Sequence, residues 1–112
     1  VVCANAASVT TQAILANGVF SVNTLAFDDE ILAETFAGRT ELRGDERFGQ
    51  GRWEIRETGA PVLADALVSF DCRLRESPLI ATHHLLVGEV VAVRYGLRRR
   101  ALIYRERAFT GL

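Results

Sequence analysis

The chain has 112 residues, of which 49% are hydrophobic and 24% charged, and its formal net charge is −1. These values are typical of one water-soluble domain with a single hydrophobic core. The small net charge gives no electrostatic reason to expect a nucleic acid or an anionic membrane as partner. No apolar run approaches the ~20 residues that cross a bilayer. We therefore expect a cytoplasmic protein.

Two features of the composition bear on the extent of the domain and on its redox state. The chain contains no Met and opens on the apolar run 1–4, which is typical of the interior of a strand. We therefore expect residues 1–112 to form the C-terminal two thirds of a longer domain whose first strands precede Val1. Cys3 and Cys72 form no CxxC pair, and we expect both thiols to be reduced and buried.

The first part of the chain predicts a helix followed by a strand. Ser8 can cap a short helix over 9–16, which stops at the C-terminal signal Asn17-Gly18. Alternation of apolar side chains over 19–25 then predicts a strand.

A second helix is predicted over 29–36. Asp28 can cap it, Asp29 and Glu30 lie in its first turn, where the helix dipole favours acids, and Gly38 ends it. The residues on its apolar face are Ile31, Leu32, Thr35 and Phe36. Residues 40–60 that follow are charged and rich in glycine, and they predict a mobile excursion anchored by Phe48 and Trp53.

From Pro61 onward the pattern is that of β-strands. Apolar and polar residues alternate with period two over 66–75. Further strands are predicted over 80–95 and 101–107, with a turn over 96–100 between them. Long antiparallel strands with two short helices at one side predict a small barrel of the α+β class.

Common catalytic motifs are absent from the sequence, which contains no GxGxxG after a strand, no P-loop, no GxSxG and no HExxH. His83 and His84 are neighbours in a predicted strand, so their rings point to opposite faces and cannot bind one metal ion. One of the two faces the barrel interior or a cleft, on the strand that also carries Glu89. The residues alone leave a purely structural role for that histidine open.

Two other places can meet an anion. Asn5 and Ser8 lie where a strand passes into a helix N-terminus, whose free N–H groups attract negative charge. Arg39 follows the second helix and can either stabilise its C-terminal end or reach a phosphate. A simple cap at Ser8 and a simple helix-end contact at Arg39 are the alternatives.

Short motifs follow one another along nearly the whole chain. They are Val2-Cys3-Ala4-Asn5 with Ser8, the segments 20–25, 36–39, 59–63 and 66–72, Thr82-His83, Gly88-Glu89-Val90, and Leu102-Ile103-Tyr104 with Arg107. In this order and spacing they resemble the flavin-reductase-like, FMN-binding split-barrel family. The reductase components of two-component flavin monooxygenases are the most similar members.

The resemblance implies a split β-barrel that transfers a hydride from NADH or NADPH to FMN or FAD. It also implies a homodimer with the flavin near the subunit interface, and a separate monooxygenase that receives the reduced flavin. The catalytic candidate is His83, which matches the family histidine beside the isoalloxazine and nicotinamide rings and would position the nicotinamide. The cofactor-binding candidates are Asn5, Ala7, Ser8, Phe36, Ala37, Gly38, Arg39, Tyr104 and Arg107.

The chain departs from the family pattern in two ways. Ala6 stands where the family often has Arg, so one phosphate contact is missing, and the family's N-terminal Ser/Thr contacts to the phosphate would precede Val1. A non-catalytic, flavin-binding dimeric module is therefore an alternative function. A related barrel that oxidises pyridoxamine phosphate is a further alternative, which the motifs fit less well.

Overall fold

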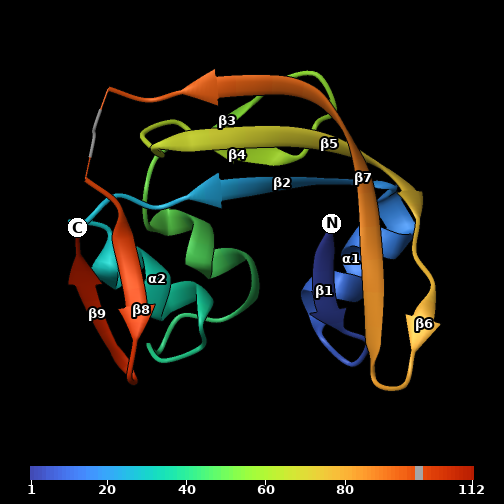
Figure 1. Cartoon of the computed structure of the whole chain (residues 1–112), viewed down its shortest axis with the longest axis horizontal. Helices are drawn as coiled ribbons and strands as arrows, with labels where there is room; N and C mark the ends of the chain where they lie inside the picture. Colours follow the sequence, from blue (N-terminus) through green and yellow to red (C-terminus); the bar gives the residue numbers. More distant parts are fainter. Residues whose placement is uncertain (98–99) are drawn as a thin grey trace.

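The computed structural model describes residues 1–97 and 100–112. Its main sheet is antiparallel and curled, with strand order β1-β7-β5-β2 and with β6 also paired to β7 (Figure 1). Two-stranded sheets β3-β4 and β8-β9 accompany it. The elements are β1 (Val2–Asn5), α1 (Val9–Asn17), β2 (Val19–Thr24), α2 (Glu30–Phe36), the 3₁₀ helix η1 (Gly44–Gly49), β3 (Trp53–Ile55), β4 (Pro61–Leu63), β5 (Val68–Glu76), β6 (Leu79–Ile80), β7 (His83–Tyr95), β8 (Leu102–Arg105) and β9 (Ala108–Gly111). This is the predicted α+β arrangement of antiparallel strands with two short helices.

The 13-residue strand β7 belongs to both halves of the curled sheet. Near its start it pairs with β1 and with β6, so that His83 lies between Asn5 and Ile80. Farther along it pairs with β5, where Val68 lies opposite Tyr95. The β5–β7 register shifts twice, and such bulges bend and twist a strand. In Figure 1, β7 accordingly runs from the layer of β5 and β2 down to β1 and β6.

Two separate clusters of buried side chains form the hydrophobic core. One consists of Phe20, Cys72 and Leu86, against which α1 packs Ile14 and Leu15. The other consists of Leu32, Leu63 and Ala66, with Leu25, Phe36 and Trp53 around it. Helix α1 therefore packs on the main sheet and α2 packs beside the β3–β4 pair, and the two helices lie at the right and at the left of Figure 1.

Helix α1 begins and ends at the predicted signals. The Ser8 hydroxyl accepts a hydrogen bond from the Thr11 amide at 3.4 Å, and this confirms the N-cap. Gly18 ends the helix with φ +71°, a conformation that favours glycine, and its N–H donates to the Ile14 carbonyl.

The prediction for α2 was wrong at its start. The helix begins at Glu30 with Asp29 at the N-cap position, one residue later than expected. The Asp29 carboxylate turns back and accepts a hydrogen bond from the Ala26 amide at 2.9 Å, which fixes the preceding turn. On the predicted apolar face Leu32 and Thr35 are buried, but Ile31 is 67% exposed.

Two predicted long strands are each broken by a turn. The strand predicted over 80–95 divides into β6 and β7, because Ala81 takes the left-handed φ of 54° between them. The strand predicted over 101–107 is the hairpin β8–β9, whose turn residues Glu106 and Arg107 both have positive φ, at 53° and 65°. Two such residues in a row are typical of a tight hairpin turn. In the turn predicted over 96–100, residues 98 and 99 lie outside the described residues.

Burial differs from the predictions at several polar and sulfur positions. Alternation along β5 is interrupted by the register shift between Asp71 and Cys72, which are both buried, and the polar residues Ser69 and Asp71 are buried at 3% and 1% exposure. Cys72 is buried and Cys3 is exposed, and both thiols are free. The predicted burial is confirmed for Cys72 and was wrong for Cys3, because alternate residues of β1 are exposed. The reduced state of the thiols stays a prediction.

The segment 40–60 contains regular structure, namely η1 and the strand β3. Its predicted anchors are confirmed: the rings of Phe36 and Phe48 lie 5.2 Å apart, and those of Phe48 and Trp53 lie 5.0 Å apart. Its mobility stays a prediction. No helix in the described part of the chain is long and apolar enough to cross a membrane.

Gly96 follows the last residue of β7 and lies against the loop that joins β4 to β5. A Cβ there would lie 2.0 Å from the Ala66 carbonyl oxygen, which is backbone and cannot move aside. We expect Gly96→Ala to lower the free energy of unfolding by about 1–3 kcal/mol, measured by urea denaturation. Gly49→Ala is the matched control, because its Cβ would meet no atom within 4 Å. Equal stability of the two variants would contradict this account.

Candidate functional site

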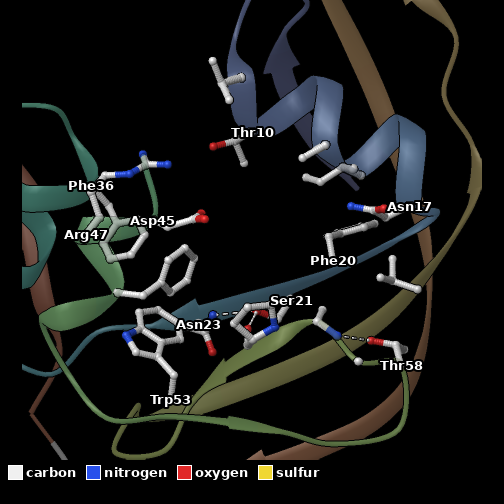
Figure 2. A pocket seen from close by; sticks show the side chains of 18 of the residues that line it. Thr10, Asn17, Phe20, Ser21, Asn23, Phe36, Asp45, Arg47, Trp53 and Thr58 are labelled. Carbon is white, nitrogen blue, oxygen red and sulfur yellow. Dashed lines mark hydrogen bonds between the residues drawn. The ribbon is translucent and has the colours of Figure 1, made fainter. Parts of the chain in front are cut away.

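A cleft of about 700 Å³ opens between α1 and the 3₁₀ helix η1. Its residues come from α1, from β2, from the α2–η1 region and from the loop before β4. Figure 2 shows Thr10 on one side, Phe36, Arg47 and Trp53 on the opposite side, and Ser21 between them. The cleft therefore has one wall along the side of α1, from Val9 to Asn17, and one wall of aromatic rings.

The predicted residues Asn5, Ala7 and Ser8 form the turn that leads into α1. The Asn5 side-chain oxygen accepts a hydrogen bond from the Ala7 amide at 2.9 Å. The Ser8 hydroxyl serves the Thr11 amide, as described above. Both side chains are thus used to shape the turn, and their amide and hydroxyl groups hold α1 at a fixed angle to β1.

The first two residues of α1, Val9 and Thr10, both line the cleft. Within the described residues neither backbone amide has an acceptor. Unpaired N–H groups in the first turn of a helix carry its positive dipole end. The start of α1 therefore offers donors to an anion without the loss of any internal hydrogen bond.

The opposite wall is an aromatic cluster beside one cationic side chain. The rings of Phe36, Phe48 and Trp53 lie within 5.0–5.4 Å of one another. The Arg47 guanidinium lies 5.2 Å from the centre of the Phe36 ring. Its Nε donates to the Gly44 carbonyl at 2.9 Å, which holds the side chain against η1.

The floor of the cleft is held by polar side chains of β2. The Ser21 hydroxyl donates to the Pro61 carbonyl, and the Asn23 amide group donates to Ser21 while its oxygen accepts from the Leu63 amide at 3.0 Å. These bonds attach β4 to β2 where no strand pairing joins them. The polar groups of Ser21 and Asn23 are therefore engaged in holding the floor in place.

A buried carboxylate positions the loop that completes the floor. Asp71 is 1% exposed and accepts two hydrogen bonds from Thr58, one from its amide at 3.0 Å and one from its hydroxyl at 2.5 Å. The Thr58 hydroxyl in turn accepts from the Ala60 amide at 3.1 Å. Thr58 and Ala60 line the cleft, whereas Asp71 does not. Asp71 therefore holds this part of the floor in position through its bonds to Thr58.

The other predicted group gathers at the end of α2. Arg39 donates a hydrogen bond to the Tyr104 hydroxyl at 2.8 Å and forms an ion pair with Glu34 at 3.4 Å. The contact with Tyr104, followed by that with Glu34, raises the pKa of Arg39 above its ordinary value, so the guanidinium stays charged. Gly38 makes this approach possible through its φ of +76°. The segment 36–39 is thereby joined to the hairpin β8–β9.

The structure places His83 beside Asn5, because the two residues are partners in the β1–β7 register. Its Nδ1 shares a hydrogen bond of 2.9 Å with the Thr82 hydroxyl. The Nδ1 of His84 donates to the Ser77 carbonyl at 2.8 Å. The His84 ring thus stabilises the turn before β6.

The predicted residues therefore form two groups, with the cleft between them. Asn5, Ala7, Ser8 and His83 lie together at the α1 end, and the segment 36–39 lies with Tyr104 at the other. Among these candidates only Phe36 lines the cleft itself. Arg107 belongs to neither group, because it lies in the β8–β9 turn.

Several residues that shape the cleft were missed by sequence reasoning. Arg47 lies in a charged stretch in which no periodicity distinguishes it from its neighbours. Asn23 and Asp71 carried only a weak signal, since each is a polar strand residue that can accept backbone hydrogen bonds but has other polar residues beside it in its strand.

The whole chain, residues 1–112, matches the family model described as "Flavin reductase like domain". FMN reductase (NADH) RutF of Agrobacterium fabrum is 44% identical over 96% of this chain and 61% of its own length. The protein of the same name from Variovorax paradoxus is 42% identical over 96% of this chain and 59% of its own. The chain thus spans about three fifths of the length of these curated relatives.

Solved structures confirm the predicted fold. A protein named as a flavin reductase from Haemophilus somnus superposes with a TM-score of 0.91 at 32% identity, over 99% of this chain and 70% of that one. BorF, the flavin reductase component of a bacterial two-component tryptophan halogenase, superposes with a TM-score of 0.87 at 31% identity, over 98% of this chain and 69% of that one.

Removing the buried carboxylate tests how the loop of Thr58 is held. We expect Asp71→Ala to lower the free energy of unfolding by about 3 kcal/mol, because the Thr58 amide and hydroxyl lose a charged acceptor. Thr58→Ser keeps both hydrogen bonds and is expected to change stability by less than about 0.5 kcal/mol. Urea denaturation measures both, and an Asp71→Ala protein as stable as the parent would disprove the role of the carboxylate.

Proposed function

Because the chain belongs to the flavin reductase like domain family, we propose that it is part of a flavin reductase that uses NADH to reduce FMN. The relatives named FMN reductase (NADH), at 42–44% identity, support this pair of substrates over FAD and NADPH. The observation that carries the proposal is the cleft between α1 and η1, which is lined by the first residues of α1 on one side and by aromatic rings on the other.

The donor groups at the cleft suit a phosphorylated flavin. The amides of Val9 and Thr10 can take phosphate oxygens at the positive end of α1. This arrangement compensates for Ala6, which supplies no cation at the position where relatives often carry Arg. Asn5 and Ser8 act here by shaping the turn that presents those amides.

Bound flavin supplies the redox chemistry, because its N5 accepts the hydride that leaves C4 of the nicotinamide. The side chains of the protein bind and orient the two ring systems. His83 lies beside the turn of Asn5, where its ring can position the nicotinamide without exchanging a proton. Arg39 and Tyr104 present a charged and a phenolic donor from the far side.

The same proposal includes a homodimer and a partner monooxygenase. Exposed apolar residues on β6 and β7, namely Leu79, Ile80, Val90, Val93 and Tyr95, support an interface between copies of the chain. BorF, named as one component of a two-component halogenase, supports the transfer of reduced flavin to a second enzyme. A cytoplasmic location stays a prediction, in keeping with the two free thiols.

The catalytic proposal is tested by NADH oxidation with FMN added, using the complete protein. We expect saturable, flavin-dependent oxidation, faster with NADH than with NADPH and with FMN than with FAD. His83→Ala is expected to lower kcat/KM on the order of 10²-fold, because a misplaced ring loses the reactive geometry. His84→Ala is the control and should retain activity, since its ring bonds the Ser77 carbonyl instead. No oxidation by a folded protein would favour the non-catalytic flavin-binding module.

The proposed phosphate site is tested by removing one amide while keeping the helix. Proline is favoured at the first helical position, which is Val9, and Ser8 already has the extended φ and ψ of −68° and 137° that proline requires of its predecessor. We expect Val9→Pro to weaken FMN binding about tenfold, through the loss of one charge-assisted hydrogen bond. Riboflavin, which lacks the phosphate, should bind both proteins equally.

Val9→Ala serves as the control for the lost side chain, because it keeps the amide. Calorimetric titration with FMN and with riboflavin measures both variants. If Val9→Pro weakens the two flavins alike, the phosphate does not bind at the start of α1.

A further inference from the structure

The residue before His83 contacts the His83 ring, and no role described above uses this contact. The Thr82 hydroxyl lies 2.9 Å from Nδ1 of His83. Within the described residues the other ring nitrogen, Nε2, has no hydrogen-bond partner, and the Thr82 hydroxyl has no second one. The ring is thus held at one nitrogen by its own neighbour and is open to a ligand at the other.

The turn between β6 and β7 makes this contact possible. Neighbours in an extended strand point to opposite faces, so the side chains of Thr82 and His83 could not meet there. Ile80 is instead paired with His83 across the hairpin. Ala81 and Thr82 are therefore the two central residues of a tight turn. Ala81 takes the left-handed φ of 54°, which costs free energy for a residue with a Cβ.

The backbone of Thr82 is also attached to the turn that precedes α1. Its carbonyl accepts a hydrogen bond from the Ala6 amide at 2.9 Å. His83 itself is paired with Asn5 in the β1–β7 register. Thr82 is therefore held in place relative to the turn of Asn5, and a hydroxyl at this position gives the His83 ring a constant orientation.

The hydrogen-bond partners indicate which nitrogen of the neutral ring carries the hydrogen. A threonine hydroxyl donates one hydrogen, and a neutral histidine has one ring nitrogen that accepts and one that donates. Among the described residues, Nδ1 of His83 is the acceptor that the Thr82 hydroxyl reaches. When the hydroxyl donates to Nδ1, the hydrogen of the ring lies on Nε2, which becomes an available donor.

We propose that Thr82 is a positioning residue for flavin reduction: its hydroxyl holds His83 as the Nε2–H tautomer, which donates to the carboxamide oxygen of the nicotinamide. The inference rests on the proposed reductase function, which supplies NADH as the substrate. It assigns no proton transfer to either residue, because the hydride passes directly from the nicotinamide to the flavin. A donor of fixed direction favours one orientation of the nicotinamide ring.

The tautomer is measured first, by nitrogen NMR of the complete protein at about pH 8.5, where an ordinary histidine is neutral. The His83 signals are those that disappear in His83→Ala. We expect Nε2 to carry the hydrogen in the unmodified protein and in Thr82→Ser, which keeps the hydroxyl. Thr82→Val keeps the shape without the hydroxyl. There the preference for Nε2–H should fall about fivefold, because one exposed neutral hydrogen bond is lost.

Two results of the NMR measurement would overturn the proposal. One is a hydrogen on Nδ1 in the unmodified protein. The other is the same distribution of tautomers in the unmodified protein, Thr82→Ser and Thr82→Val.

Kinetics then test whether Thr82 acts through His83. We expect Thr82→Val to lower kcat/KM for NADH about fivefold and Thr82→Ser to recover most of the loss. KM for FMN should stay unchanged, because valine keeps the backbone carbonyl that accepts from the Ala6 amide. In the His83→Ala background Thr82→Val should have no effect, since the ring on which it acts is absent.

The other kinetic outcomes contradict the proposal in distinct ways. An equal loss with and without His83 would mean that Thr82 only stabilises the turn. A rise in KM for FMN would place its effect on the flavin rather than on the nicotinamide. If the unmodified protein oxidises no NADH, the reductase function fails and the role in the reaction fails with it. The NMR measurement then still decides whether Thr82 fixes the His83 ring.

Thr24→Val is the matched control for the loss of a threonine hydroxyl. Thr24 is exposed in β2 and lies outside the cleft, and its hydroxyl has no hydrogen-bond partner in the described ranges. The kcat/KM of this variant and the tautomer of its His83 should match those of the unmodified protein. Urea denaturation of both valine variants separates a loss of stability from a loss of positioning.

Discussion

The pairing of β7 with strands on both halves of the sheet is the constraint on which the rest of the molecule depends. One end of β7 sets Asn5 against His83, and the other end sets Val68 against Tyr95. Between them Gly88 lets the strand pass over the core, because a Cβ there would lie 2.5 Å from the Phe20 ring. The site depends on this path, since it fixes where α1 begins relative to the floor of the cleft.

Buried polar groups attach the parts of the structure that strand pairing does not join. The β3–β4 hairpin belongs to no larger sheet among the described residues, and it is attached by the side chains of Ser21 and Asn23 and by the loop that Asp71 holds. In the described part of the chain every buried side-chain nitrogen and oxygen has a partner. Such satisfied networks fix a single arrangement, because breaking one bond leaves a desolvated group behind.

Much of the fold could be predicted from the sequence because local signals agreed with tertiary structure. Ser8 and Gly18 bound α1 as expected, and β2 lies within the predicted range 19–25. The two strands that were predicted too long are interrupted by residues in a left-handed conformation. Ala81 and Glu106 are not glycine, and nothing in a β-branched or alternating pattern marks such positions as turns.

The candidate site was predictable only in part, for a different reason. The motif order singled out the segments around Asn5 and Phe36, of which Phe36 lines the cleft and Asn5 lies in the turn before α1, and their binding roles stay predictions. The cleft between them is made by contacts distant in sequence, such as Asp71 with Thr58 and Asn23 with Leu63. Periodicity carries no information on which polar side chain accepts from which distant amide.

The hairpin β8–β9 is joined to the remainder of the described structure by few bonds: the bridge between Ala26 and Ala101 and backbone bonds beside it, the stacking of Arg100 on Phe27, and the contact of Arg39 with Tyr104. Exposed side-chain pairs such as that of Arg39 with Tyr104 contribute little free energy, so we expect the hairpin to open more readily than the main sheet. We therefore expect the amide hydrogens of β9 to exchange with solvent faster than those of β5. A ligand that bridged Arg39 and Tyr104 would slow that exchange, so the exchange rate of β9 would show whether this end of the site is occupied.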